Sequence, residues 1–128
     1  MILELADIRI KPGAQVAFDA AIQKDIDSVI ANAKGFMGYR VNRGIESPQR
    51  SILMIFWQTL ENHTVNFRLS PAFQERRAIV GPYFSGPPVV EHFTLLAESV
   101  LTESMLPDSV GDRNMAHRRS RACGGTRI

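Results

Sequence analysis

The sequence predicts an α+β domain with a ferredoxin-like, split βαβ arrangement and a four-stranded antiparallel sheet. Two observations support this fold class. Segments with two-residue periodicity and segments with helical periodicity follow one another in the order strand, helix, strand, strand, two short helices, strand. The segment 51–57, Ser-Ile-Leu-Met-Ile-Phe-Trp, is apolar at consecutive positions, so a strand formed there must be covered on both faces.

The first third of the chain is predicted to form one strand and one long helix. Side chains alternate between two faces over residues 2–10, and a Pro-Gly pair at 12–13 ends this strand. Apolar residues then recur at three- and four-residue steps between Phe18 and Ala33, which predicts an amphipathic helix of about four to five turns. Gly35 follows, and we expect it to adopt the left-handed conformation that ends many helices.

Three further strands are predicted over residues 36–43, 51–57 and 89–96. A turn joins the first two, because a Ser-Pro pair interrupts the pattern between them. In the last strand His92 directly follows Glu91, so these two polar side chains are expected on opposite faces of the sheet.

Two short helices are predicted between the third strand and the last. Thr59 is expected to cap the first helix, whose apolar side also carries His63. Ser70, followed by a proline, is expected to cap the second helix, which spans residues 71–80. A Gly-Pro pair at 81–82 ends this helix.

The expected fold leaves one face of the sheet without a cover. Both helical segments of such a domain pack on the same face, so the other face is open in a single copy. The apolar segment 51–57 therefore predicts that a second copy of the chain covers this face through a two-fold contact. We expect a homodimer.

The composition is that of one ordinary soluble domain. The chain has 128 residues, of which 45% are hydrophobic and 22% charged, with a formal net charge of +2. A single cysteine, Cys123, excludes an internal disulfide and a multi-cysteine metal site. No apolar run is long enough to span a bilayer, and the first residues lack the pattern of a signal peptide. We therefore expect a cytoplasmic protein that has no membrane partner.

Charge is distributed unevenly towards the end of the chain. Residues 97–112 carry four acids and no base, whereas residues 113–128 carry five arginines and no acid. We expect the domain to span 1–96 and a flexible or peripheral tail to span 97–128. An arginine-rich tail can also bind nucleic acid, but this tail contains no aromatic residue, so we favour a solvated tail.

The residues around the end of the third strand carry a family resemblance. They include Trp57, the run Thr59-Leu60-Glu61-Asn62-His63-Thr64, Phe67-Arg68, Ser70-Pro71-Ala72-Phe73 and the later run Pro87-Pro88-Val89-Val90-Glu91-His92-Phe93. With these residues the chain resembles, over about residues 1–96, the antibiotic biosynthesis monooxygenase family of the dimeric α+β barrel superfamily. The resemblance implies a dimer. Members of this superfamily include oxygenases that act on quinols and aromatic polyketides without a cofactor.

The superfamily also contains haem-degrading oxygenases, whose pattern the chain does not match. The resemblance places Asp7, Asn66 or Phe67, and Arg76 where those enzymes have an asparagine, a tryptophan and a haem-ligating histidine. Arginine stays protonated and cannot ligate iron. No glycine-rich loop follows a strand, and the histidines of the domain lack a companion at metal-ligand spacing. We therefore expect no cofactor and no metal.

Cofactor-free oxygenation, which the resemblance implies, needs a base, a cation and an apolar cavity. The expected catalytic residues are the two histidines of the domain, a residue type whose unperturbed pKa suits proton transfer, and one arginine, which can stabilise an oxyanion: His63, His92 and Arg68. The expected substrate-binding residues are mainly aromatic: Trp57, Phe67, Tyr83, Tyr39 and Asn66.

Each candidate also has a structural interpretation. His63 can be a half-buried histidine bonded to the backbone, and His92 can be a contact between subunits. Trp57 can be a core residue, because it ends the most apolar strand. Arg68 and Arg76 can form ion pairs on helix surfaces, which contribute little to stability.

The resemblance thus implies a small cofactor-independent monooxygenase that uses molecular oxygen on a quinol-like or aromatic polyphenolic metabolite. In the reaction that it implies, a base removes a proton from the substrate, and the resulting anion passes an electron to oxygen. The alternative is a non-catalytic or stress-associated dimeric α/β-barrel protein that binds a small hydrophobic molecule. A convergent pair of histidine and arginine side chains in one cavity favours the enzyme.

Overall fold

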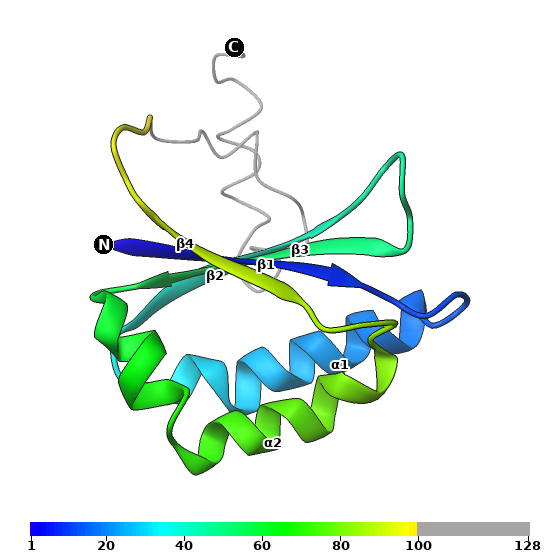
Figure 1. Ribbon diagram of the computed structural model, residues 1–128, viewed down its shortest axis with the longest axis horizontal. Helices are drawn as coiled ribbons and strands as arrows, with labels where there is room; N and C mark the ends of the chain where they lie inside the picture. Colours follow the sequence, from blue (N-terminus) through cyan, green and yellow to red (C-terminus); the bar gives the residue numbers. More distant parts are fainter. Residues whose placement is uncertain (100–128) are drawn as a thin grey trace, which may run out of the picture. The chain divides into compact units, whose positions relative to one another are not determined.

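The computed structural model describes residues 1–99 and consists of a sheet with helices packed on one of its faces (Figure 1). The strands are β1 (Ile2–Arg9), β2 (Phe36–Arg43), β3 (Arg50–Trp57) and β4 (Val89–Thr94). The helices are α1 (Gln15–Ser28), α2 (Pro71–Val80), the π-helical segment η2 (Asn62–Phe67) and the 3-10 turns η1 (Ile30–Asn32) and η3 (Gly81–Tyr83).

Every strand is antiparallel to its neighbours, in the order β2-β3-β1-β4. The apolar strand β3 lies in the interior of the sheet, between β2 and β1. The register places Glu4 of β1 between Ile55 of β3 and His92 of β4. The predicted fold class, a ferredoxin-like split βαβ domain with a four-stranded antiparallel sheet, is confirmed.

Element boundaries differ from the predicted ones by a few residues. The helix expected between Phe18 and Ala33 is α1 followed by the turn η1, and β4 ends at Thr94 instead of reaching residue 96. Most of the tail predicted over 97–128 lies outside the described residues. Within residues 1–99, no helix has the length and apolar character needed to cross a membrane.

The core lies between the sheet and the helices. Alternate residues of β1 and β3 face the helices, because successive side chains of a strand point to opposite sides. The largest core side chains, which have no accessible surface, are Trp57, Phe18, Ile30, Leu53 and Val80. Burying each of them fully contributes about 1.5–3 kcal/mol relative to an exposed side chain, so this layer stabilises the fold.

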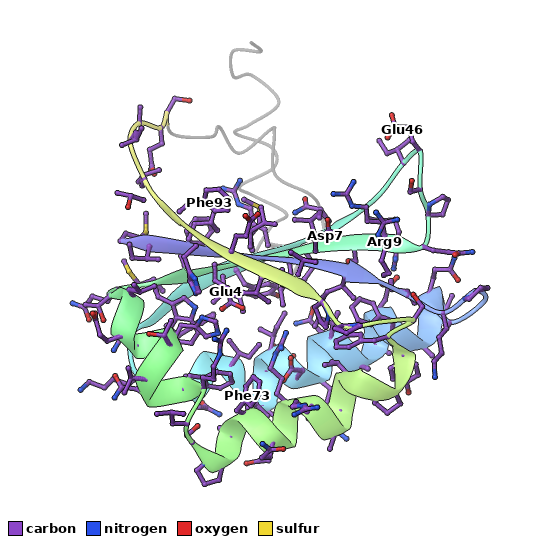
Figure 2. The ribbon with its side chains drawn as sticks, viewed as in Figure 1. Glu4, Asp7, Arg9, Glu46, Phe73 and Phe93 are labelled. Carbon is purple, nitrogen blue, oxygen red and sulfur yellow. The ribbon has the colours of Figure 1, made fainter. Side chains whose placement is uncertain are left out.

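The opposite face of the sheet also carries large apolar side chains. Its half-buried members come from β1 and β3 and are Leu3, Leu5, Ile52, Met54 and Phe56. On β4, Phe93 is 45% exposed and points away from the helices (Figure 2). At one end of this face Arg50 donates two hydrogen bonds to Asp7, at 3.0 and 2.7 Å, which lowers the pKa of Asp7.

The turn after β3 is held by reciprocal hydrogen bonds. The Asn62 backbone N–H donates to Thr59 Oγ1 at 3.2 Å, and the Thr59 N–H donates to Asn62 Oδ1 at 3.0 Å, so Thr59 caps this segment as predicted. Ser70 is the residue before α2, but the prediction that its side chain caps the helix is wrong, because that side chain makes no capping hydrogen bond. The Ser70 hydroxyl instead donates to the carbonyl of Phe67 at 2.6 Å, because the end of η2 offers an acceptor there.

Gly35 supports the same turn from the start of β2. Its φ of +83° is the left-handed conformation predicted from the sequence. A Cβ atom at this position would lie 2.1 Å from Asn62 Oδ1. Only glycine therefore allows Asn62, and with it the start of η2, to lie this close to β2.

We predict that Gly35→Ala lowers the free energy of unfolding by about 2 kcal/mol or more, because it combines a strained φ with a clash. Urea denaturation followed by circular dichroism measures the change. Gly81→Ala is the matched control, since a Cβ there meets no atom within 4 Å and its φ is a helical −54°. Equal losses in the two variants would contradict the close packing of Gly35 on Asn62.

Candidate active site

A connected group of four side chains lies on the helix-facing side of the sheet. Trp57 Nε1 donates a hydrogen bond to Glu4 Oε1 at 2.9 Å. A second hydrogen bond joins His63 Nδ1 and His92 Nε2 at 2.8 Å. His63 Nε2 lies 3.4 Å from Glu4 Oε1, which links the two pairs. Residues from β1, β3, β4 and η2 thus form one polar cluster around a carboxylate, which we call the Glu4 cluster.

Local structure fixes His63 in this cluster. The segment η2 carries His63 and Phe67 towards the sheet, and both side chains are buried. The His63 ring stacks on Trp57 with 5.5 Å between centroids and an interplanar angle of 14°. Phe67 packs against both rings, at 5.8 Å from Trp57 and 6.3 Å from His63. Short π-helical segments are rare and often occur at functional sites.

Burial and nearby charges set the protonation of the cluster. Burial, with help from Arg68, His92 and Arg76, lowers the pKa of His63 to about 3, so its imidazole is neutral at physiological pH. Burial raises the pKa of Glu4, and the Trp57 hydrogen bond and nearby positive charges oppose this shift.

The neutral His63 ring can pass a proton along the cluster. Its single N–H lies either on Nε2, towards Glu4, or on Nδ1, towards His92, and His92 takes the complementary role. An exchange of tautomers would move a proton between Glu4 and His92 once the 3.4 Å contact, which is longer than a hydrogen bond, shortens. The His63–His92 step is already a hydrogen bond.

The Glu4 cluster borders a cleft of about 960 Å³, a volume that suits a drug-sized or smaller organic molecule. Figure 2 shows Glu4 between the sheet and the helices, with Phe73 on the helical side. The polar residues of the lining include Glu4, His63, Arg68, Arg76 and Arg77. The apolar residues include Phe73, Phe84, Pro87, Pro88 and Val90. The cleft thus combines apolar walls with a base and cations.

Arg76 reaches the cleft from a buried ion pair. Its Nε donates to Asp25 Oδ2 at 2.9 Å, and the side chain of Asp25 is fully buried in α1. Burial raises the pKa of Asp25 to about 6, and the charge of Arg76 opposes this shift. The expectation of a surface ion pair at Arg76 is therefore wrong, because the partner belongs to the core.

The family can be assigned from the matched part of the chain. Residues 1–78 match the family model described as antibiotic biosynthesis monooxygenase, which is more than half of the chain. The chain belongs to this family. The match includes Glu4, Trp57 and His63 and confirms the resemblance found in the sequence, whereas His92 and the proline-rich wall of the cleft lie beyond it.

Relatives and solved structures agree with the assignment. The chain is 32% identical over 93 residues to YczJ, an uncharacterised protein of Bacillus subtilis, over 73% of this chain and 97% of the relative. A crystal structure from Bordetella bronchiseptica, provisionally named as an antibiotic biosynthesis monooxygenase, is 38% identical, with a TM-score of 0.71 over 75% of this chain and 97% of that one. A monooxygenase of Streptomyces coelicolor, solved with the ligand nanaomycin D, has the same fold at 16% identity, with a TM-score of 0.67 over 78% of this chain and 91% of that one.

Within this family domain, the structure brings together only part of the sequence-predicted site. His63 and His92 meet, Arg68 lines the cleft, and Trp57 and Phe67 support the His63 ring.

Three other candidates lie elsewhere. Tyr83 lines a separate groove of about 570 Å³ beside α1 and α2, and the Tyr39 hydroxyl accepts a hydrogen bond from Gln23 at 3.2 Å. Asn66 is exposed, and its Oδ1 accepts from Asn62 at 3.3 Å.

Sequence reasoning missed three residues, of which two had a visible signal. Glu4 is an acid on the otherwise apolar face of β1, and Asp25 occupies the apolar stripe of α1, three residues after Ile22. A charge at such a position needs a partner. Arg76 had no comparable signal, since it stands in the polar run Gln74-Glu75-Arg76-Arg77 in the middle of α2. Among residues 1–99, no three His, Cys, Asp or Glu side chains are grouped so that they could hold a metal ion.

We predict that His63 makes stability depend on pH. Between about pH 6.5 and pH 3 the unfolded imidazole binds a proton that the folded one does not, so the free energy of unfolding falls as pH decreases through this window. Asp25, with its raised pKa, acts in the opposite direction between about pH 6 and 4, so the contribution of His63 is measured as a difference between variants.

Relative to His63→Gln, the wild-type protein should lose on the order of 2 kcal/mol between pH 6.5 and 4.5. Urea denaturation at a series of pH values measures this difference. Parallel pH profiles for the two proteins would mean that His63 is not held neutral.

Proposed function

We propose that this family domain is a small cofactor-independent monooxygenase that acts with molecular oxygen on a quinol-like or aromatic polyphenolic metabolite. The observation that carries the proposal is the Glu4–His63–His92 chain at the edge of a largely apolar cleft lined by arginines. Such a site offers a proton acceptor, a route for the proton and cations beside a developing negative charge.

In the proposed reaction, Glu4 accepts a proton from the hydroxyl or activated C–H group of the bound substrate. Both ring nitrogens of His63 face other residues of the cluster, which leaves the carboxylate of Glu4 as the acceptor at the cleft. His63 and His92 then relay this proton. Arg68 and Arg76 line the same cleft and stabilise the substrate anion.

Oxygen enters the product in a balanced sequence. For an anthrone-type substrate, the anion transfers one electron to dioxygen, and the carbon radical and superoxide combine and take up a proton to give a hydroperoxide. Loss of water from the hydroperoxide leaves a new C=O group. One oxygen atom ends in the product and the other in water, and the substrate supplies both hydrogens of that water.

The Streptomyces coelicolor monooxygenase has the same fold and was solved with nanaomycin D. This likeness of fold supports an aromatic ligand for the present domain. The proposed substrate contacts are the cleft residues Arg68, Arg76 and Phe73, with Trp57 and Phe67 behind His63. Tyr39, Tyr83 and Asn66 are not part of this proposal, because they lie outside the lining of the cleft. We expect the domain to act in the cytoplasm and without a cofactor.

A non-catalytic ligand-binding domain is the second candidate. It is favoured by one observation, the engagement of both ring nitrogens of His63 within the protein, which leaves neither directed at a ligand.

We predict that the wild-type protein consumes oxygen in the presence of an anthrone or hydroquinone and that Glu4→Gln and His63→Ala lower the rate about 100-fold or more, because they remove the acceptor and the relay. An oxygen electrode with a panel of such substrates measures the rate. Glu75→Gln is the matched control, since Glu75 is exposed on α2 and outside the cleft lining.

The outcomes separate the two candidates. Uptake that persists in both Glu4→Gln and His63→Ala would show that the Glu4 cluster is not the site. Binding of the aromatic compounds without any oxygen uptake would support the ligand-binding domain.

We further propose that the functional unit is a homodimer in which a second copy covers the open face of the sheet. The support is the row of apolar side chains on that face, among them Ile52, Met54, Phe56 and Phe93, opposite the helical layer. Exposed apolar surfaces of this kind commonly mark interfaces between subunits.

We predict that Phe93→Glu converts the dimer to a monomer, because it buries a charge in the interface. Sedimentation velocity at micromolar concentration measures the state of association. Val16→Glu is the control, since Val16 is 85% exposed on α1, in the helical layer. A wild-type protein that sediments as a monomer would refute the proposed dimer.

A further inference from the structure

The cleft beside the Glu4 cluster has an excess of positive charge. Three arginines, Arg68, Arg76 and Arg77, are among its lining residues, whereas Glu4 is the one acid among them. Arg77 lies over the ring of Phe73, 6.0 Å from its centroid. An uncharged hydrophobic ligand would not use this charge, so its placement indicates a ligand with a negative group.

Arg76 is the arginine whose position is fixed. Its side chain is 12% exposed, and its Nε is held by the fully buried carboxylate of Asp25. Its Nη2 and the Oδ1 of Asp25 are both buried and have no hydrogen-bond partner among the described residues, so the two groups satisfy each other only in part. The guanidinium is therefore not fully paired by Asp25, and the part of Arg76 that lines the cleft can bind an acceptor supplied by a ligand. Arg76 is therefore a preorganised anchor for an anionic group.

The rest of the lining fits a flat ring system. Phe73 and Phe84 contribute aromatic surface, and the segment 86–88, Gly-Pro-Pro, forms a wall with few polar groups. The occupant that matches both parts of the cleft is therefore an aromatic molecule that carries one anionic substituent.

We propose that the cleft is a binding site for an aromatic carboxylate, with its carboxylate group on Arg76 and its ring system against Phe73 and the proline wall. The proposal deepens the proposed function and rests on it for one point, that the same molecule presents a reactive position to Glu4. Carboxylates suit this anchor because arginine pairs with them through charge-assisted, directional hydrogen bonds.

Binding can be tested without turnover by using ligands that are already oxidised. The probes are anthraquinone-2-carboxylate and its neutral counterpart anthraquinone-2-carboxamide. Trp57 is the one tryptophan of the sequence and stacks on His63, a residue of the cleft lining, so quenching of its fluorescence reports binding. Isothermal titration calorimetry gives the affinity independently.

The wild-type protein should bind the carboxylate about tenfold more tightly than the carboxamide, or better. Arg76→Gln should remove this preference. Because that variant leaves Asp25 buried without its partner and can fail to fold, the double variant Asp25→Asn/Arg76→Gln, which removes both charges, provides a second test. Lys11→Gln removes one positive charge from an exposed loop position outside the cleft lining, and it should keep the preference.

Equal affinities of the wild-type protein for the two probes would overturn the proposal, as would a folded double variant that keeps the preference. No detectable binding of the carboxylate would also overturn it. A carboxylate preference without oxygen uptake on any substrate would leave the binding site standing and remove the monooxygenase. Oxygen uptake on neutral hydroquinones without a carboxylate preference would support the monooxygenase and overturn the carboxylate site.

Discussion

The site depends on one buried carboxylate in the middle of an apolar strand. Glu4 is 3% exposed on the core face of β1, where an ionised group without partners would be strongly destabilising. The Trp57 N–H supplies its hydrogen bond, and the histidine pair lies on its other side. The requirement to satisfy this one group explains why an indole ends β3, why η2 turns His63 inwards and why His92 faces the helices from β4.

The topology makes this cluster possible. In the strand order β2-β3-β1-β4, the N-terminal strand lies between two strands that come much later in the chain. Glu4 therefore has a β3 residue on one side and His92 on the other. Because side chains alternate along a strand, the same strands present the cluster to the helices and apolar residues to the opposite face. The candidate active site and the proposed subunit interface thus lie on opposite faces of the sheet.

The second buried acid has a different role. The ion pair between Asp25 and Arg76 joins α1 to α2, but a buried ion pair contributes little net stability compared with apolar packing. Its position is better explained by the guanidinium that it holds at the cleft. Burial raises the pKa of both acids, of Asp25 to about 6, and the arginines near them favour the ionised forms. The charges of core and cleft are therefore coupled, so the proposed ligand at Arg76 would also act on the Glu4 cluster.

The sequence by itself determined the order of elements and the fold class, because these follow from local periodicity and from turn residues such as Gly35. It also placed His63 on the apolar side of its helix and His92 on the face of its strand opposite Glu91, but it left open which face of that strand meets the helices. Only the tertiary structure decided that these histidines meet each other, that Glu4 joins them and that Arg76 pairs with Asp25. Those contacts join residues 29 to 59 positions apart, and periodicity along one segment carries no information about which distant side chain will lie opposite. Tyr39 and Tyr83 were expected to bind substrate because they are aromatic. Packing directs both side chains elsewhere: Tyr39 towards Gln23, and Tyr83 into a separate groove.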